Sequence, residues 1–178
     1  MAFEIYNTTP KVWLERPELG IYAASISQIW ALIEQDLSRI FIILSGSNLA
    51  LGAAFATVVA IQNRLRMVQK LVDRFLDKPD RAQFERLAGR IERMGRRRNA
   101  VVHGLWSIRK EEPDAVFLNN PYPRTQAEAE PVVWRKANFG RLILDLEALR
   151  ADVGKFRKHL TDLKKVQPFP RSFLIVDE

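Results

Sequence analysis

The sequence predicts a mainly α-helical fold: an antiparallel helical bundle with a small antiparallel β insertion after its third helix. Three observations support this fold class. Apolar residues recur at alternating spacings of three and four over most of the chain, as on the buried face of a helix. Between residues 106 and 137 this pattern gives way to short apolar runs separated by turn residues. The composition, 47% apolar and 28% charged, is typical of a globular chain, and we expect residues 1–178 to form a single domain.

The first helix is expected from Pro17 to Leu44. Its apolar residues form one stripe along one face: Tyr22, Ile26, Ile29, Ile33, Leu37, Ile40 and Leu44. The run Ser-Gly-Ser-Asn at 45–48 would end this helix and cap the next one. The second helix is then expected from Leu49 to Asp77.

Residues 40–63 carry no charge, and 24 such residues would be long enough to cross a bilayer. We nevertheless expect no membrane span, because the polar run at 45–48 interrupts the stretch and the stripe of the first helix enters it from a charged region. Its small residues, Gly46, Gly52, Ala53, Ala54 and Ala56, instead predict two antiparallel helices in close contact.

The third helix is expected to begin at Asp80, since Asp80 and Gln83 resemble a capping box. The insertion at 106–137 follows it, and a small antiparallel sheet of two or three strands is expected there, over residues 106–109 and 115–118 with 132–135 as the candidate third strand. Asn138 is the expected N-cap of a fourth helix, which would end before Pro168. Residues 168–178 are expected to form a C-terminal tail.

Cysteine and histidine usage excludes several classes of site. The chain has no cysteine, which rules out disulfides, thiol nucleophiles and cysteine-ligated metals. With only two histidines, we expect no metal and no cofactor. The first residues show no secretory signal, so we expect a cytoplasmic protein.

Most of the positive charge lies in one short segment. The formal net charge is +7, and residues 81–98 contribute seven arginines against two glutamates, or +5. Four of these arginines are expected to group on the solvent side of the third helix: Arg86, Arg90, Arg93 and Arg97. Because arginine binds phosphate through paired hydrogen bonds and stays charged, this surface favours RNA as a partner. A solvated face that maintains solubility is the alternative.

Arg98 occupies a position that belongs to the apolar stripe of the third helix. The stripe passes from Met94 to Val101, and at 100° per residue Arg98 falls within about 40° of its centre. A guanidinium there must be paired or must line a cleft, because burying an unpaired charge is very unfavourable. We therefore expect Arg98 either to pair with an acid such as Asp36 or Asp145, or to line a functional site.

The segment that starts at Arg98 resembles the motif of the HEPN family, small helical bundles. The run Arg98-Asn99-Ala100-Val101-Val102-His103 has the family's arginine, a polar residue next to it, and a histidine after four intervening positions. This resemblance implies a metal-independent endoribonuclease that acts as a homodimer, with the motifs of both protomers facing one cleft. It also implies a toxin or defence effector, whose antitoxin would be nucleotidyltransferase-like or another neighbour-encoded protein.

The residue types of the motif fit this chemistry. RNA cleavage without metal needs a base for the 2′-OH proton, a cation for the phosphorane and an acid for the leaving oxygen. An unperturbed imidazole titrates at about pH 6.5 and can act as a base or an acid, whereas arginine is a fixed positive charge. We expect His103 as the general base or acid, Arg98 as the phosphate clamp and Asn99 as an orienting residue. A single motif histidine per protomer is a chemical reason to expect a homodimer.

Other interpretations of the same residues stay open. A non-catalytic bundle of this type would bind RNA or a protein partner, and His103 would then cap the carbonyls at the end of the third helix. A helical interaction protein whose arginines meet an acidic partner is a third class. Trp106, beside the motif, is a candidate for stacking on an RNA base, although core packing is the more common role of such a residue.

Overall fold

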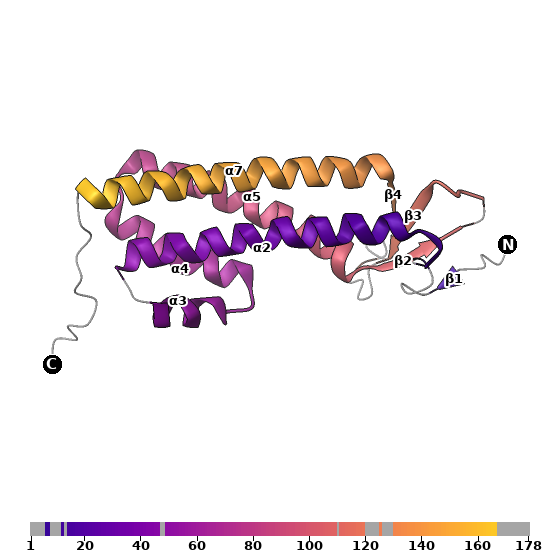
Figure 1. The fold of residues 1–178 in the computed structure, drawn as a ribbon, viewed down its shortest axis with the longest axis horizontal. Coiled ribbons are helices and arrows are strands. Elements are labelled where there is room, and N and C mark those ends of the chain that lie inside the picture. Colours follow the sequence, from indigo (N-terminus) through magenta and orange to yellow (C-terminus); the bar gives the residue numbers. More distant parts are fainter. Residues whose placement is uncertain are drawn as a thin grey trace. The chain divides into compact units, whose positions relative to one another are not determined.

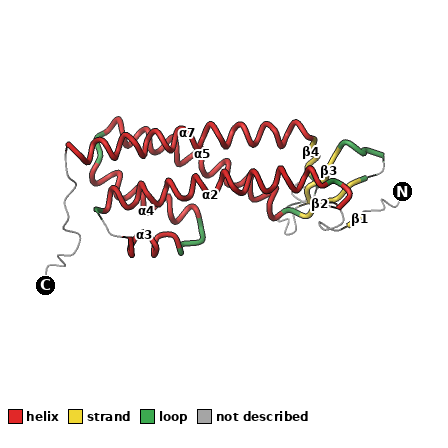
Figure 2. The backbone as a smooth tube through the Cα atoms, viewed as in Figure 1, coloured by secondary structure: helices red, strands yellow, loops and turns green. Residues whose placement is uncertain are grey.

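A computed structural model describes residues 6–7, 12, 14–46, 49–109, 111–119, 125 and 130–166. This part of the chain is mainly helical with one small antiparallel sheet, as the sequence predicts (Figures 1 and 2). That the helices form a bundle of the HEPN type stays a prediction. The expected C-terminal tail, residues 168–178, lies outside the described residues.

The elements follow the predicted order with two additions. The helices are α2 (Pro17–Ser45), α3 (Leu49–Ala56), α4 (Ile61–Phe75), α5 (Lys78–His103) and α7 (Lys136–Val166). The strands are β1 (Tyr6–Asn7), β2 (Leu105–Ile108), β3 (Ala115–Asn119) and β4 (Val132–Arg135). The chain divides into two compact units, one made of Met1–Trp30 and Met94–Glu147, the other of Ala31–Arg93 and Ala148–Glu178. Each unit buries its own set of apolar side chains.

The first unit contains the sheet. Its four antiparallel strands lie in the order β1-β2-β3-β4, so the predicted sheet and its candidate third strand at 132–135 are confirmed, whereas β1 was not predicted. Trp106 lies opposite Leu118 in the register of β2 and β3. The indole of Trp106 stacks on Phe139 of α7 with the ring centroids 5.3 Å apart, and Phe139 also stacks on Tyr22 of α2 at 5.5 Å. An aromatic core therefore fixes the sheet to the helices of this unit.

A close approach between α2 and α5 also stabilises the first unit. A Cβ added to Gly95 would lie 3.0 Å from the indole of Trp30, which is 4% exposed. The absence of a side chain at Gly95 therefore leaves room for the Trp30 ring to lie close to the backbone of α5. This contact lies one turn before Arg98 and positions the last turns of α5.

The second unit shows where the predicted second helix, Leu49–Asp77, is wrong. The structure has two helices there, α3 and α4, separated by residues 57–60. The side chain of Arg64, 9% exposed, donates hydrogen bonds to the carbonyl oxygens of Ala56, at 2.7 Å, and of Val58. These donors satisfy carbonyls that a continuous helix would have bonded internally, so the chain can turn here.

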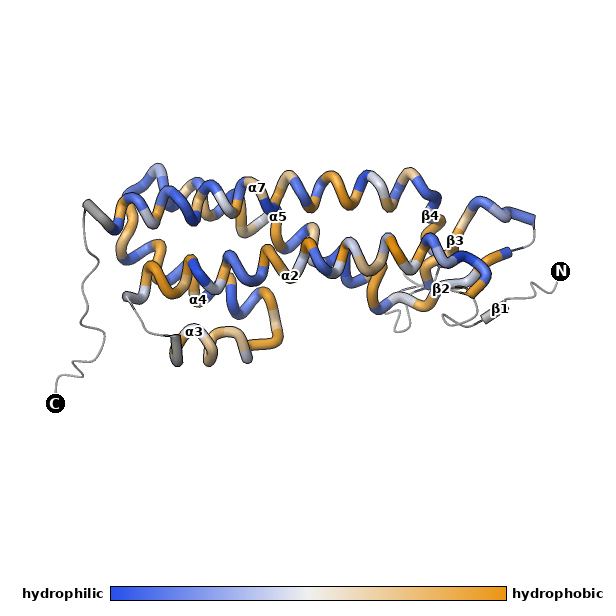
Figure 3. The backbone as a smooth tube through the Cα atoms, in the orientation of Figure 1, coloured by the Kyte–Doolittle hydropathy of each residue, from blue (hydrophilic) through white to orange (hydrophobic). Residues whose placement is uncertain are grey.

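Of the small residues in the uncharged stretch, Gly52 makes the predicted close contact, whereas Ala53, Ala54 and Ala56 are exposed. A Cβ on Gly52 of α3 would lie 2.5 Å from Cδ1 of Ile42 on α2, so the two helices are in close contact. Gly46 ends α2 with a φ of 62°, a left-handed conformation that favours glycine. Among the described residues, no helix is both long and apolar enough to cross a membrane. Figure 3 shows hydrophobic and hydrophilic residues alternating along α2 instead.

The caps of α5 and α7 differ from the predicted ones. Helix α5 begins at Lys78, and the Oδ1 of Asp77 accepts a hydrogen bond from the backbone N–H of Asp80 at 3.0 Å. Asp77 is therefore the N-cap, and Asp80 lies in the first turn. Asn138 likewise lies in the first turn of α7, where its Oδ1 accepts from the N–H of Arg135 at 2.8 Å.

Candidate active site

The three predicted catalytic residues contact one another at the end of α5. Arg98 Nη1 donates to Asn99 Oδ1 at 2.9 Å and lies 3.2 Å from His103 Nε2. Because Nη1 carries two hydrogens, it can serve both acceptors at once. A guanidinium only donates, so His103 Nε2 is the acceptor in a hydrogen bond between the two side chains. Asn99 and His103 are exposed, whereas Arg98 is half-buried.

The reach of the Arg98 side chain brings these groups together. On an ideal helix, residues five apart differ by about 140° in direction and by about 7.5 Å in rise. Helix α5 continues through His103, and the long side chain of Arg98 still reaches both Asn99 and His103.

Gly104 closes the helix beneath this site. Its N–H donates to the carbonyl of Ala100 at 3.0 Å. A Cβ at this position would lie 2.2 Å from that same carbonyl oxygen and 2.7 Å from Cδ2 of Leu118 on β3. Glycine is therefore needed here because a side chain has no space. Backbone conformation is not the reason, since among the described glycines the positive φ belongs to Gly46. His103 thus lies directly before a tight junction between α5 and the sheet.

No carboxylate pairs with Arg98 among the described residues, so its expected pairing with Asp36 or Asp145 is wrong. Asp145 accepts a hydrogen bond from Arg97 at 2.9 Å, and Asp36 lies 3.4 Å from Arg157. The Nε of Arg98 is buried and has no hydrogen-bond partner within the described part of the chain. Leaving one buried N–H unsatisfied costs about 1–3 kcal/mol, so Arg98 is not explained by stability alone.

The predicted RNA-binding arginines do not form one free surface. Arg86 and Arg93 are exposed, but Arg90 and Arg97 lie at the border with α7. Arg90 Nη1 lies 2.6 Å from Asp152, and Arg97 Nη1 lies 2.9 Å from Asp145. Both side chains stay more than one third exposed, but each is paired with an aspartate of α7. Their seven-residue spacing matches that of Asp145 and Asp152, which is the signal in the sequence for this pairing.

The Arg90–Asp152 pair also has an electrostatic consequence. The hydrogen bond from Arg90 holds the pKa of the Asp152 carboxyl below its ordinary value, against the opposing effect of burial. Both side chains are more than one third exposed, so water screens the pair. Arg90 is consequently a weak stabilising residue of the second unit rather than a free cation.

Arg96 is an exposed cation that the sequence interpretation left unassigned. It lies seven residues before His103 on α5, so the two differ by about 20° in direction around the helix. Asn99 and Ala100, both exposed, lie between them on this face. No ion pair or hydrogen bond involves the Arg96 side chain within the described part of the chain. The seven-residue spacing between Arg96 and His103 was the feature of the sequence that could have indicated their shared helix face.

Trp106 does not lie on the surface. It is 1% exposed, and its Nε1 donates to the carbonyl of Val101 at 2.9 Å. The indole ring is therefore buried in the core and its N–H is hydrogen-bonded there. The candidate role of Trp106 in stacking on an RNA base is wrong. The exposed apolar side chain beside the motif is its neighbour Leu105, which is 52% exposed.

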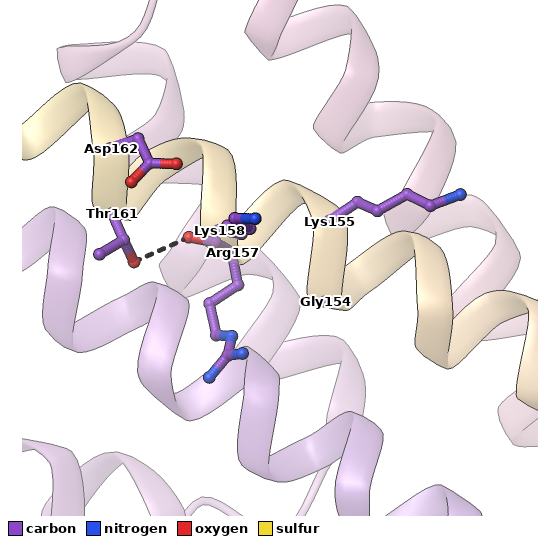
Figure 4. A pocket seen from close by; sticks show the side chains of 6 residues that line it. All are labelled: Gly154, Lys155, Arg157, Lys158, Thr161 and Asp162. Carbon is purple, nitrogen blue, oxygen red and sulfur yellow. Dashed lines mark hydrogen bonds between the residues drawn. The ribbon is translucent and has the colours of Figure 1, made fainter.

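A separate hollow of about 530 Å³ lies on α7 in the second unit (Figure 4). It is lined by Gly154, Lys155, Arg157, Lys158, Thr161 and Asp162. Two of its cations have acidic neighbours: Lys155 lies 3.4 Å from Asp152, and Arg157 lies 3.4 Å from Asp36. The Thr161 hydroxyl donates to the Arg157 carbonyl at 3.0 Å, as Figure 4 shows. Because these lining residues are engaged with neighbouring protein groups, the contacts do not point to a particular ligand for the hollow.

Within the described ranges, no cluster of three or more metal-binding side chains occurs. Comparison of the chain with protein-family models, with curated proteins and with solved structures found no match in any of the three. The function is therefore argued from the geometry around Arg98 and His103.

Proposed function

We propose that the protein is a metal-independent endoribonuclease of the HEPN type. In this proposal His103 is the general base or acid, Arg98 stabilises the phosphorane and Asn99 orients Arg98. One observation carries the proposal: the Arg98 guanidinium lies 3.2 Å from the His103 imidazole and, in the described part of the chain, no carboxylate accompanies it. A cation beside an imidazole can supply charge stabilisation and proton transfer, two of the functions that metal-free phosphodiester cleavage needs.

The contacts suggest how substrate would engage the site. Arg98 Nη1 is bonded to Asn99 and His103, whereas no hydrogen bond of Nη2 occurs within the described residues. Nη2 would therefore bind a phosphate oxygen of RNA. A phosphate accepts more strongly than a neutral imidazole, so it would also draw Nη1 away from His103. His103 Nε2 would then be free to take the 2′-OH proton.

A second copy of the chain would complete the chemistry. One protomer supplies one motif imidazole, whereas cleavage needs a base and an acid. In a homodimer with both motifs at one cleft, the second His103 would protonate the leaving 5′-oxygen. Such an enzyme would act on cytoplasmic RNA as a toxin or defence effector, with a neighbour-encoded antitoxin, for instance a nucleotidyltransferase-like protein, as its inhibitor.

A second candidate function is a non-catalytic module that binds RNA or a protein. The observation that favours it is that His103 Nε2, the atom that would accept a proton, is already engaged by Arg98. In this case the Arg98, Asn99 and His103 contacts would stabilise the end of α5. RNA binding would then depend on salt, because phosphate contacts release counterions.

The test is cleavage of a single-stranded RNA by the purified protein in EDTA. We expect cleavage by the wild type and loss of at least about 100-fold in rate for His103→Ala, the lower range for general acid–base catalysis. His159→Ala is the matched control, because His159 pairs with Asp80 in the second unit at 3.0 Å and lies outside the motif. Equal cleavage by wild type and His103→Ala would refute the proposal. Salt-dependent RNA binding without cleavage would establish the second candidate.

A further inference from the structure

We propose that Arg96 forms a second phosphate site, which binds the RNA backbone next to the phosphate that is cleaved. The substrate is then an oligonucleotide rather than a dinucleotide. This inference rests on the proposed function, because it places the cleaved phosphate at Arg98 and His103.

The argument begins with the cations that remain available at the end of α5. Arg97 is hydrogen-bonded to Asp145 at 2.9 Å, and Arg98 is bonded to the motif residues through Nη1. Arg96 is exposed, and no ion pair of its guanidinium occurs within the described residues, although Glu92 lies four residues earlier on the same helix. Arg96 is thus the cation of this segment that is ready to bind an anion from solvent.

The helical spacing separates Arg96 from the cleaved phosphate. Seven residues correspond to a rise of about 10.5 Å, and helix side chains lean toward the N-terminus, away from His103. Arg96 and His103 therefore contact different phosphates. Because the two residues differ by only about 20° in direction, one strand laid along α5 reaches both.

The surface between the two residues leaves room for this strand. Ala100, four residues after Arg96 and three before His103, is exposed and has only a methyl side chain. Asn99 is the neighbouring polar residue on the same face, and its Oδ1 is held by Arg98. The long side chain of α5 that reaches this face is that of Arg98, whose guanidinium contacts Asn99 and His103 at the end nearer the cleaved phosphate.

The experiment combines an enzyme variant with a modified substrate. One set of RNA oligonucleotides carries a single neutral methylphosphonate at each position near the cleaved bond. For wild type, we expect kcat/KM to fall about 10-fold when the neutral linkage lies at the Arg96 site. Arg96→Ala should lose about the same factor on unmodified RNA and nothing further on that modified substrate, since the contact is already absent. Arg66→Ala, which removes an exposed arginine of α4, is the charge-matched control and should keep the wild-type pattern.

The outcomes separate this inference from the proposed function. If Arg96→Ala responds to every neutral linkage as the wild type does, the Arg96 site is refuted while RNA cleavage stands. If the wild type cleaves no RNA, the proposed function fails, and affinity for 2′-O-methyl oligonucleotides becomes the readout. In that case the same methylphosphonate must weaken binding by wild type and by Arg66→Ala but not by Arg96→Ala, and equal weakening of all three overturns the inference.

Discussion

Replacing Gly104 by alanine is expected to destabilise the protein by about 3 kcal/mol. The new Cβ would lie 2.2 Å from the Ala100 carbonyl oxygen and 2.7 Å from Leu118 Cδ2. Ordinary carbon–oxygen contacts are about 3.3 Å or longer, so the backbone must move by about 1 Å. Overpacking of this kind costs about 1–3 kcal/mol, and loss of the hydrogen bond from the Gly104 N–H adds about 1 kcal/mol.

Thermal unfolding followed by circular dichroism measures this effect. For a chain of this size, about 3 kcal/mol corresponds to a decrease in Tm of about 9 °C. Gly140→Ala on α7 is the matched control, since a Cβ there meets nothing within 4 Å. That variant should be more stable by up to about 1 kcal/mol, because alanine has the higher helix propensity. A Gly104→Ala protein within about 0.5 kcal/mol of wild type would show that the junction after His103 is not as tight as described.

Substitutions at three further positions test other contacts. Trp106→Ala should cost about 3–5 kcal/mol in the free energy of unfolding, because it empties a buried site, whereas Trp106→Phe should cost about 1 kcal/mol; an equal loss for both would contradict the role of the ring. Arg64→Met should speed amide hydrogen exchange in α3, because the Ala56 carbonyl loses its donor; unchanged exchange would contradict the capping role. Asp152→Asn should cost about 0.5 kcal/mol near pH 7. Since the native pKa of Asp152 is lowered, this difference should disappear as the pH falls below about 4, and a constant difference would refute it.

The sequence predicted the parts of the fold that depend on local pattern. Helix α2 begins at the predicted residue and ends one residue later than predicted, because its stripe and Gly46 specify both the buried face and the end. The three strands of the insertion were found because their apolar runs are separated by turn residues. The break between α3 and α4 was not predicted, since it depends on the side chain of Arg64, which lies in the following helix.

The candidate site was predictable in a similar, partial way. Helix geometry placed Arg98 on the inner side of α5, and the structure shows it half-buried with a buried Nε. Which arginine meets Asp145 depends on how α5 and α7 align, and this alignment cannot be read from either helix alone. The burial of Trp106 likewise depends on Phe139, 33 residues further along the chain.

Arg64 also has a consequence for the synthesis of the protein. During translation, residues 40–63 emerge as an uncharged segment, and Arg64 is the first charged residue after it. Until that side chain reaches the carbonyls of Ala56 and Val58, α3 lacks the contacts that end it in the folded state. A variant without Arg64 would therefore prolong the exposure of an apolar segment in the nascent chain. Its defect would be seen first as aggregation during expression.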